Sequence, residues 1–199
     1  LPISWDSGLR TFELDVGMTR DGVVVVAHDP LLNMDIARGA DGRWLDRVGP
    51  AIHALTFAEL SRYDVGRLRP GSDYAALYNR QTPHDGARVP TLASVLRALP
   101  DAHFIVELKT IPTHPDHTGT PESLAEATLA TIVEADADAR VTIESFDWRG
   151  PRHVRRLRPD IPLAWLTRAE TVRDAVLWWG GPVPNDFAGS VPRAVAAEG

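Results

Sequence analysis

Residues 11–16, Thr-Phe-Glu-Leu-Asp-Val, are the most informative stretch for the fold of this chain, because apolar and acidic side chains alternate along them. Alternation with a period of two is typical of a β-strand. Side chains at positions i and i+2 of a strand share a face, so Glu13 and Asp15 point in the same direction. Two close carboxylates repel each other, and a hard divalent cation relieves that repulsion. Two exposed acids on an edge strand are the alternative.

Strand-like and helical runs alternate outward from this stretch. Thr120 is placed to cap the longest predicted helix, with Pro121 at its first position. Strand alternating with helix predicts an α/β fold with a parallel sheet or barrel. The predicted strands span residues 9–16, 23–28, 103–109, 140–145 and 161–166, and the predicted helices span residues 56–63, 92–99, 123–134, 149–157, 170–179 and 191–198.

Charged side chains recur where the predicted strands end. His28 follows a run of valines, Glu107 and Lys109 share a face of one strand, and Glu144 closes another. A (β/α)₈ barrel carries its active site at the carboxyl ends of its strands, so the pattern favours this TIM-barrel fold. Taken singly, Glu107 and Lys109 also fit a surface ion pair, and His28 also fits a hydrogen-bonded core histidine.

Residues 29–90 interrupt the alternation with many Gly, Pro, Asp and Arg residues. A connection of this length is typical of an active-site lid or an inserted subdomain. We therefore expect a single domain over residues 1–199, with residues 29–90 inserted after the second strand.

The composition limits the partners and the chemistry. The 199 residues carry a formal net charge of −6, so a nucleic-acid partner is not expected. No apolar run is long enough for a membrane span. Cysteine is absent, which excludes disulfides and thiolate metal sites. Among 21 basic residues, Lys109 is the only lysine. The compartment, cytoplasmic or periplasmic, and the oligomeric state stay open.

Two weaker candidates lie near the later strands. His114 and His117, in Thr-His-Pro-Asp-His, could bind a metal ion, but Pro115 prevents a helical ligand face, so a solvated loop is favoured. Trp148 follows a predicted strand and could line a substrate pocket, although the core is the usual place for a tryptophan.

Several blocks of the chain, in order, resemble the glycerophosphodiester phosphodiesterase family. The first is Phe-Glu-Leu-Asp-Val-Gly-Met-Thr-Arg-Asp-Gly-Val at residues 12–23, followed by Val-Ala-His-Asp-Pro at residues 26–30. Later blocks lie at residues 89–92, 106–109 and 144–148. The resemblance implies a (β/α)₈ barrel that hydrolyses glycerophosphodiesters, which are small molecules, to glycerol 3-phosphate and an alcohol.

The resemblance also implies roles for particular residues. Glu13, Asp15 and Glu107 match the family's ligands for Ca²⁺ or Mg²⁺. His28 matches one of its two acid–base histidines. Lys109 matches a residue that contacts the phosphate, and Phe146 matches one that packs beside the glycerol moiety.

The chain also departs from the family pattern. The first family block, with its His-Arg-Gly segment, and the closing strand are not found, so we expect a barrel that is incomplete at both ends. Catalysis by this chain alone is therefore open, and a non-catalytic fragment that binds metal and phosphate is the main alternative. A sugar-processing barrel with paired carboxylates is another.

Overall fold

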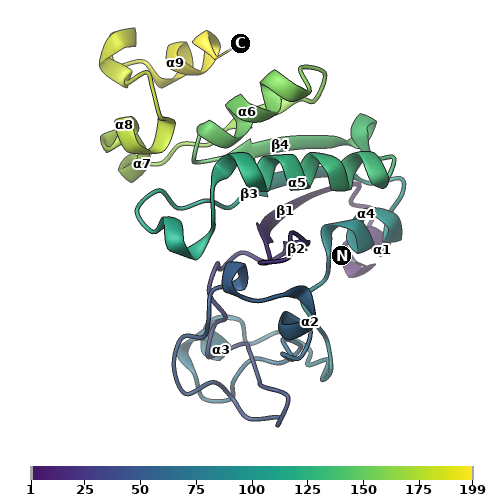
Figure 1. The fold of residues 1–199 in the computed structure, drawn as a ribbon. Coiled ribbons are helices and arrows are strands. Elements are labelled where there is room, and N and C mark those ends of the chain that lie inside the picture. Colours follow the sequence, from purple (N-terminus) through teal and green to yellow (C-terminus); the bar gives the residue numbers. More distant parts are fainter. Residues whose placement is uncertain (1, 199) are drawn as a thin grey trace.

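A five-stranded sheet forms the centre of the computed structural model, which describes residues 2–198 (Figure 1). Leu1 and Gly199 of the expected domain lie outside the described residues. The strand order is β2-β1-β3-β4-β5, and every neighbouring pair is parallel except β1 and β2. The strands span Thr11–Met18 (β1), Val24–Val26 (β2), His103–Leu108 (β3), Val141–Ser145 (β4) and Leu163–Trp165 (β5).

Helices connect the parallel strands, as the sequence pattern predicts. The cap predicted for the longest helix, α5, is present, because the Thr120 side chain accepts a hydrogen bond from the Ser123 backbone N–H. The helices span Pro2–Asp6 (α1), Phe57–Leu60 (α2), Asp73–Leu77 (α3), Leu92–Ala98 (α4), Pro121–Glu134 (α5), Arg149–Leu157 (α6), Ala169–Arg173 (α7), Ala175–Trp179 (α8) and Val191–Ala197 (α9). Four 3₁₀ turns span Ile52–Ala54, Pro115–His117, Asp138–Arg140 and Pro184–Phe187.

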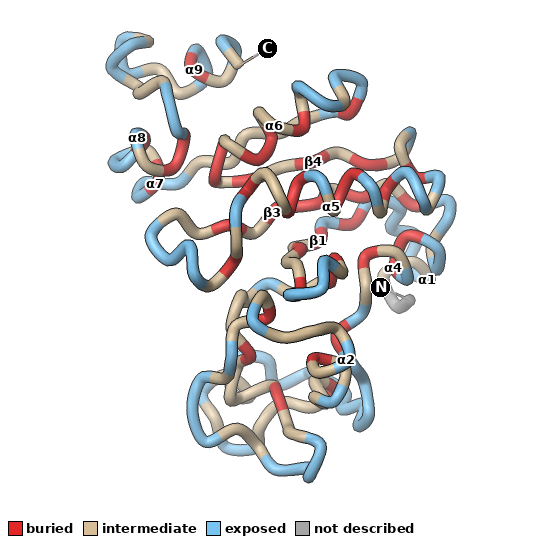
Figure 2. Tube along the Cα trace, in the orientation of Figure 1, coloured by how far each residue is buried: buried red, intermediate tan, exposed pale blue. Residues whose placement is uncertain are grey.

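The main apolar core fills the space between the sheet and helices α4, α5 and α6. Along β1, Phe12, Leu14 and Val16 are buried in this core, whereas Glu13 is exposed and Asp15 is half-buried. Figure 2 shows the buried segments concentrated along the strands and the inner face of α5. The strand predicted from the alternation at residues 11–16 is therefore confirmed, with its two acids on the opposite face from the core.

The expected α/β class is confirmed, but residues 23–28 do not form a further parallel barrel strand. β2 pairs antiparallel with β1, with Val26 opposite Val16. Only five residues join the two strands, whereas a parallel crossover needs about a dozen or more. Within the described residues the sheet ends at β2 and β5, so closure into an eight-stranded barrel stays a prediction.

Two predicted helices differ in extent from the observed ones. The run at residues 170–179 divides into α7 and α8, because the backbone of Asp174 leaves the helical region, with φ −114° and ψ 47°. The helix predicted at residues 56–63 is reduced to α2.

Among the described helices, none has the length and hydropathy needed to cross a membrane.

Candidate active site at the strand ends

Three carboxylates meet beside the central pair of parallel strands. Glu13 and Asp15 extend from β1, and Glu107 extends from β3. Asp15 lies directly opposite Glu107 in the strand register. Each of the three can place one carboxylate oxygen so that all these atoms lie within 4.8 Å of one another. The parallel pairing of β1 with β3 therefore brings together acids that are more than 90 residues apart in the sequence.

Lys109 links two of these acids. Its Nζ atom lies 3.1 Å from Asp15 Oδ1 and 3.1 Å from Glu107 Oε1. The side chains of Lys109 and Glu107 are only 19% and 10% exposed, so this is not the surface ion pair considered from the sequence. Three carboxylates and one ammonium group leave this cluster with excess negative charge.

Burial and mutual repulsion change the protonation of the acids. Burial raises the pKa of Glu107 to about 7, even though the positive charge of Lys109 opposes the shift. Partial desolvation and the neighbouring Asp15 also raise the pKa of Glu13, while Lys109 and His28 oppose this shift. Burial would lower the pKa of Lys109, but the carboxylates of Glu107 and Asp15 outweigh it and raise that pKa. The acids thus favour a further positive charge nearby.

Glu144 joins the acid cluster, although the sequence gave it no role beyond its position near a strand end. It lies opposite Glu107 in the register of β3 and β4. Desolvation raises the pKa of Glu144, and the charges of Glu13 and Asp15 raise it further. In the sequence, the signal that could have identified Glu144 was the recurrence of acidic residues at strand ends. Only the strand order in the sheet shows which of these acids become neighbours.

His28 approaches the acids because β2 runs back along β1. The Ala27 backbone N–H donates to the Asp15 carbonyl at 2.9 Å, which places the next residue beside the first half of β1. The His28 Nδ1 donates to Asp29 Oδ1 at 2.8 Å, and 71% of the His28 side chain is exposed. The alternative of a buried core histidine is therefore wrong.

The two aromatic residues expected at the substrate differ in burial, because Trp148 is enclosed in an apolar cluster with the carboxyl-terminal helices and Phe146 only packs against that cluster. Trp148 is fully buried, stacks on Trp179 at 4.1 Å between ring centroids, and donates from Nε1 to the Leu166 carbonyl. A side chain enclosed in this way has no surface for a ligand, so the expectation that Trp148 lines a substrate pocket is wrong. Phe146 is half-buried, and the Arg168 guanidinium lies 5.2 Å from its ring centroid.

Two cavities border this site. One, of about 600 Å³, begins at His28 and Asp29 and extends among mostly apolar side chains of residues 29–90, the stretch called the inserted segment below. A much smaller one, of about 10 Å³, lies between Lys109, His117 and the His53 side chain. Residues 29–90 thus contribute walls to both cavities.

The donor set of the acid cluster fits a hard divalent cation. All three candidate ligands are carboxylates, and Ca²⁺ and Mg²⁺ prefer oxygen ligands. A cation would also compensate the repulsion that raises the pKa of Glu13. Glu13, Asp15 and Glu107 are therefore the residues that could hold such an ion.

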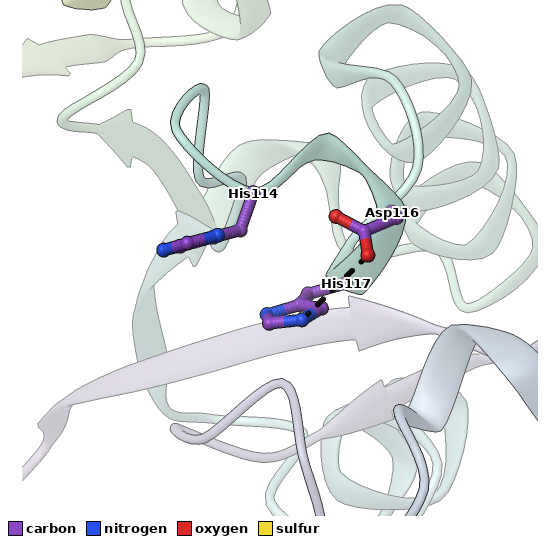
Figure 3. Close-up of side chains that lie close together, drawn as sticks. All are labelled: His114, Asp116 and His117. Carbon is purple, nitrogen blue, oxygen red and sulfur yellow. Dashed lines mark ion pairs between the residues drawn. The ribbon is translucent and has the colours of Figure 1, made fainter.

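A second group of possible ligands lies on the loop after β3. His114, Asp116 and His117 can also place one donor atom each within 4.8 Å of one another (Figure 3). The sequence favoured a solvated loop here. The loop is indeed exposed at His114 and Asp116, and within it the 3₁₀ turn at Pro115–His117 brings the two imidazoles and the carboxylate together.

These features define an α/β protein with a carboxylate site toward the carboxyl ends of parallel strands. The model of the glycerophosphoryl diester phosphodiesterase family matches residues 4–187, and the chain belongs to this family.

Individual relatives agree with this assignment. A glycerophosphodiester phosphodiesterase of Caldanaerobacter subterraneus is 28% identical over 159 residues, which cover 80% of this chain and 55% of the relative. The crystal structure of a candidate glycerophosphoryl diester phosphodiesterase from Silicibacter pomeroyi is 29% identical, with a TM-score of 0.85, over 100% of this chain and 65% of that one. The chain spans about half the length of the curated relatives it matches.

A more distant structure shares the fold. An Oleispira antarctica phosphodiesterase, in complex with the product sn-glycerol-3-phosphate, is 20% identical, with a TM-score of 0.58, over 88% of this chain and 63% of that one.

Proposed function

We propose that the protein hydrolyses glycerophosphodiesters to glycerol 3-phosphate and an alcohol, using Ca²⁺ or Mg²⁺. The observation that carries this proposal is the cluster of Glu13, Asp15 and Glu107 with Lys109, in a chain of the glycerophosphoryl diester phosphodiesterase family. Family membership also argues against the sugar-processing alternative.

The carboxylates of Glu13, Asp15 and Glu107 would hold the cation. When bound, a divalent cation supplies Lewis-acid chemistry, which stabilises the negative charge on phosphoryl oxygens. Glu144 adds negative charge beside the same ligands. The all-oxygen donor set is the reason to propose Ca²⁺ or Mg²⁺ rather than a softer metal.

Lys109 and His28 would act on the phosphodiester itself. The Lys109 ammonium would move from the acids to a phosphate oxygen, where a compact positive charge stabilises the transition state. Asp29 accepts the Nδ1 proton of His28 in a hydrogen bond, so Nε2 of the exposed ring is the atom that would exchange a proton with the substrate. Phe146 would pack beside the glycerol moiety.

Residues 29–90 would form one wall of the substrate-binding site. The cavity of about 600 Å³ starts at His28, so a group attached to the phosphate on that side would enter it. Apolar side chains such as Leu31, Ile36 and Val65 line much of this cavity. We propose that it receives part of the small-molecule substrate rather than the cation.

Cation binding is tested by thermal unfolding with EDTA, Ca²⁺ or Mg²⁺. A cation at about 100 times its Kd should stabilise the native chain by about 2.7 kcal/mol. Asp15→Asn should abolish the increase in Tm, because it removes a ligand. Glu134→Gln is the matched control, since Glu134 is exposed near the end of α5, and it should keep the increase. A wild-type Tm that is indifferent to both cations contradicts the assignment.

Turnover is measured separately, by the release of glycerol 3-phosphate from glycerophosphodiesters. Replacing an acid–base group typically lowers the rate by about 10²–10⁴-fold, so His28→Asn should do so. His84→Asn, at an exposed histidine of the inserted segment, should leave the rate unchanged. Cation binding without turnover would instead support the non-catalytic alternative.

A further inference from the structure

We propose that His114, Asp116 and His117 form a second metal site, which takes a transition-metal ion of the Zn²⁺ or Ni²⁺ type. This site lies on the loop between β3 and α5, and it shares no ligand with the acid cluster. It does not depend on the proposed phosphodiesterase activity.

The local backbone already holds the three side chains together. The His117 backbone N–H donates to the His114 carbonyl at 3.0 Å, which closes the turn between them. The two imidazole rings are stacked, with centroids 5.0 Å apart and planes inclined by 17°. Asp116 Oδ2 lies 3.8 Å from His117 Nε2, and Figure 3 shows the carboxylate directed toward that ring.

Only side-chain rotation is needed to bring the donors onto one ion. Ligands bound about 2.0–2.1 Å from a tetrahedral Zn²⁺ lie roughly 3.3 Å apart, somewhat closer than the 4.8 Å limit that encloses these atoms. His114 and Asp116 are exposed, so little packing opposes a change of rotamer. Water would complete the coordination.

The chemistry of the donors separates the two sites. Two imidazole nitrogens and one carboxylate suit Zn²⁺, Ni²⁺ or Cu²⁺, whereas three carboxylates suit Ca²⁺ or Mg²⁺. The clusters of this chain are therefore expected to select different ions even though both lie close to Lys109, which shares the small cavity with His117.

The surroundings indicate what a bound ion would do. Beyond His117, the Thr118 hydroxyl accepts from the Ile111 backbone N–H at 3.3 Å and so ties the two ends of the loop. Gly119, at φ +73°, packs so closely on the His53 ring that an added Cβ would lie 2.9 Å from it. An ion on His114 and His117 would thus fix a loop that touches the inserted segment beside Lys109.

The test is isothermal titration of the chain with ZnCl₂ at about pH 7.5, with every variant at the same pH because metal affinity depends on pH. The wild type should bind one Zn²⁺ at this loop, and His114→Ala and His117→Gln should each weaken binding by about tenfold or more. His84→Ala is the matched control and should bind as the wild type does. Melting curves without metal verify that each variant is folded.

Glu13→Gln distinguishes the two clusters. Because Glu13 belongs only to the acid cluster, this variant should keep the Zn²⁺ site. Zn²⁺ binding that survives in His114→Ala and is lost in Glu13→Gln would overturn the proposal, since the ion would then occupy the acid cluster. Absence of Zn²⁺ binding by the folded wild type would overturn it as well, whatever the outcome with Ca²⁺.

Discussion

The sheet with its helices and the inserted segment at residues 29–90 are held together by different forces. Among the residues that the structure describes, the sheet and its helices share a cluster of 20 buried apolar residues. The apolar cluster of the inserted segment has six, one of which, Val25, comes from β2. Figure 2 shows this contrast, since the lower lobe of the molecule is mostly exposed or half-buried. Hydrophobic burial therefore dominates the first region much more than the second.

Ion pairs provide part of the stabilisation of the inserted segment, which buries fewer apolar side chains. Arg38 binds the carboxylates of both Asp64 and Asp85, and Arg67 also binds Asp85. These contacts join positions up to 47 residues apart. The acids are therefore held on rigid strands, whereas the wall of the cavity beside His28 depends on an ion-pair network that should open more readily.

Truncation of a buried side chain should give the largest change in stability and should show whether the two regions unfold independently. Phe104 on β3 is fully buried in the main cluster, so Phe104→Ala should lower the free energy of unfolding by about 3–5 kcal/mol. Leu60, equally buried in the inserted segment, is the matched site. Leu60→Ala should increase amide hydrogen exchange mainly within residues 29–90. Equal loss of protection in both regions of the Leu60→Ala variant would show that they unfold as one unit.

Removal of Arg38 should have an intermediate effect that is confined to the inserted segment. Arg38→Ala leaves the carboxylate of Asp64 half-buried without its ion partner, so we expect a loss of roughly 1–3 kcal/mol. Urea unfolding and limited proteolysis measure it. Arg43→Ala is the control, because the Arg43 side chain is 87% exposed, and it should change stability by less than about 0.5 kcal/mol. Similar losses in the two variants would contradict a structural role for the ion network.

Low pH should weaken the same ion-pair network, and we expect this change in stability to be the smallest of the three. Burial would raise the pKa of Asp64, but hydrogen bonds from the backbone of Gly66 and Gly86 and the charge of Arg38 outweigh it and lower that pKa. Hydrogen bonds from Arg67 and Arg38 lower the pKa of Asp85. Both carboxylates thus stabilise the folded state above the unfolded pKa of about 3.9, and this contribution is lost as the pH falls toward their folded pKa values.

The measurement is hydrogen exchange in residues 29–90 between about pH 5 and pH 3, corrected for intrinsic rates. Protection should decrease toward the lower pH in the wild type. The decrease should be smaller in Arg38→Ala, which has already lost the pairs of Arg38 with Asp64 and Asp85 and keeps only the pair of Arg67 with Asp85. The same pH dependence in both proteins would assign the effect to other carboxylates.

The sequence alone was sufficient for the α/β class and for most of the candidate site. The alternation at residues 11–16 placed Glu13 and Asp15 on one face, because strand geometry makes i and i+2 neighbours. The start of helix α5 could also be predicted from local sequence, since the capping residue and the first turn are adjacent in the chain. Family blocks then linked Glu107 and Lys109 to the same acids.

Which distant groups meet could not be predicted from the sequence and follows from the packing of the elements. It made Glu144 a neighbour of Glu13 and Asp15, enclosed Trp148 among other tryptophans, and turned β2 back so that His28 reaches the acids. It also gathered His114, Asp116 and His117 on the exposed loop that the sequence favoured. The physical reason is that local pattern fixes the direction of a side chain within its own element, whereas strand order, burial and loop closure depend on contacts between residues far apart in the chain.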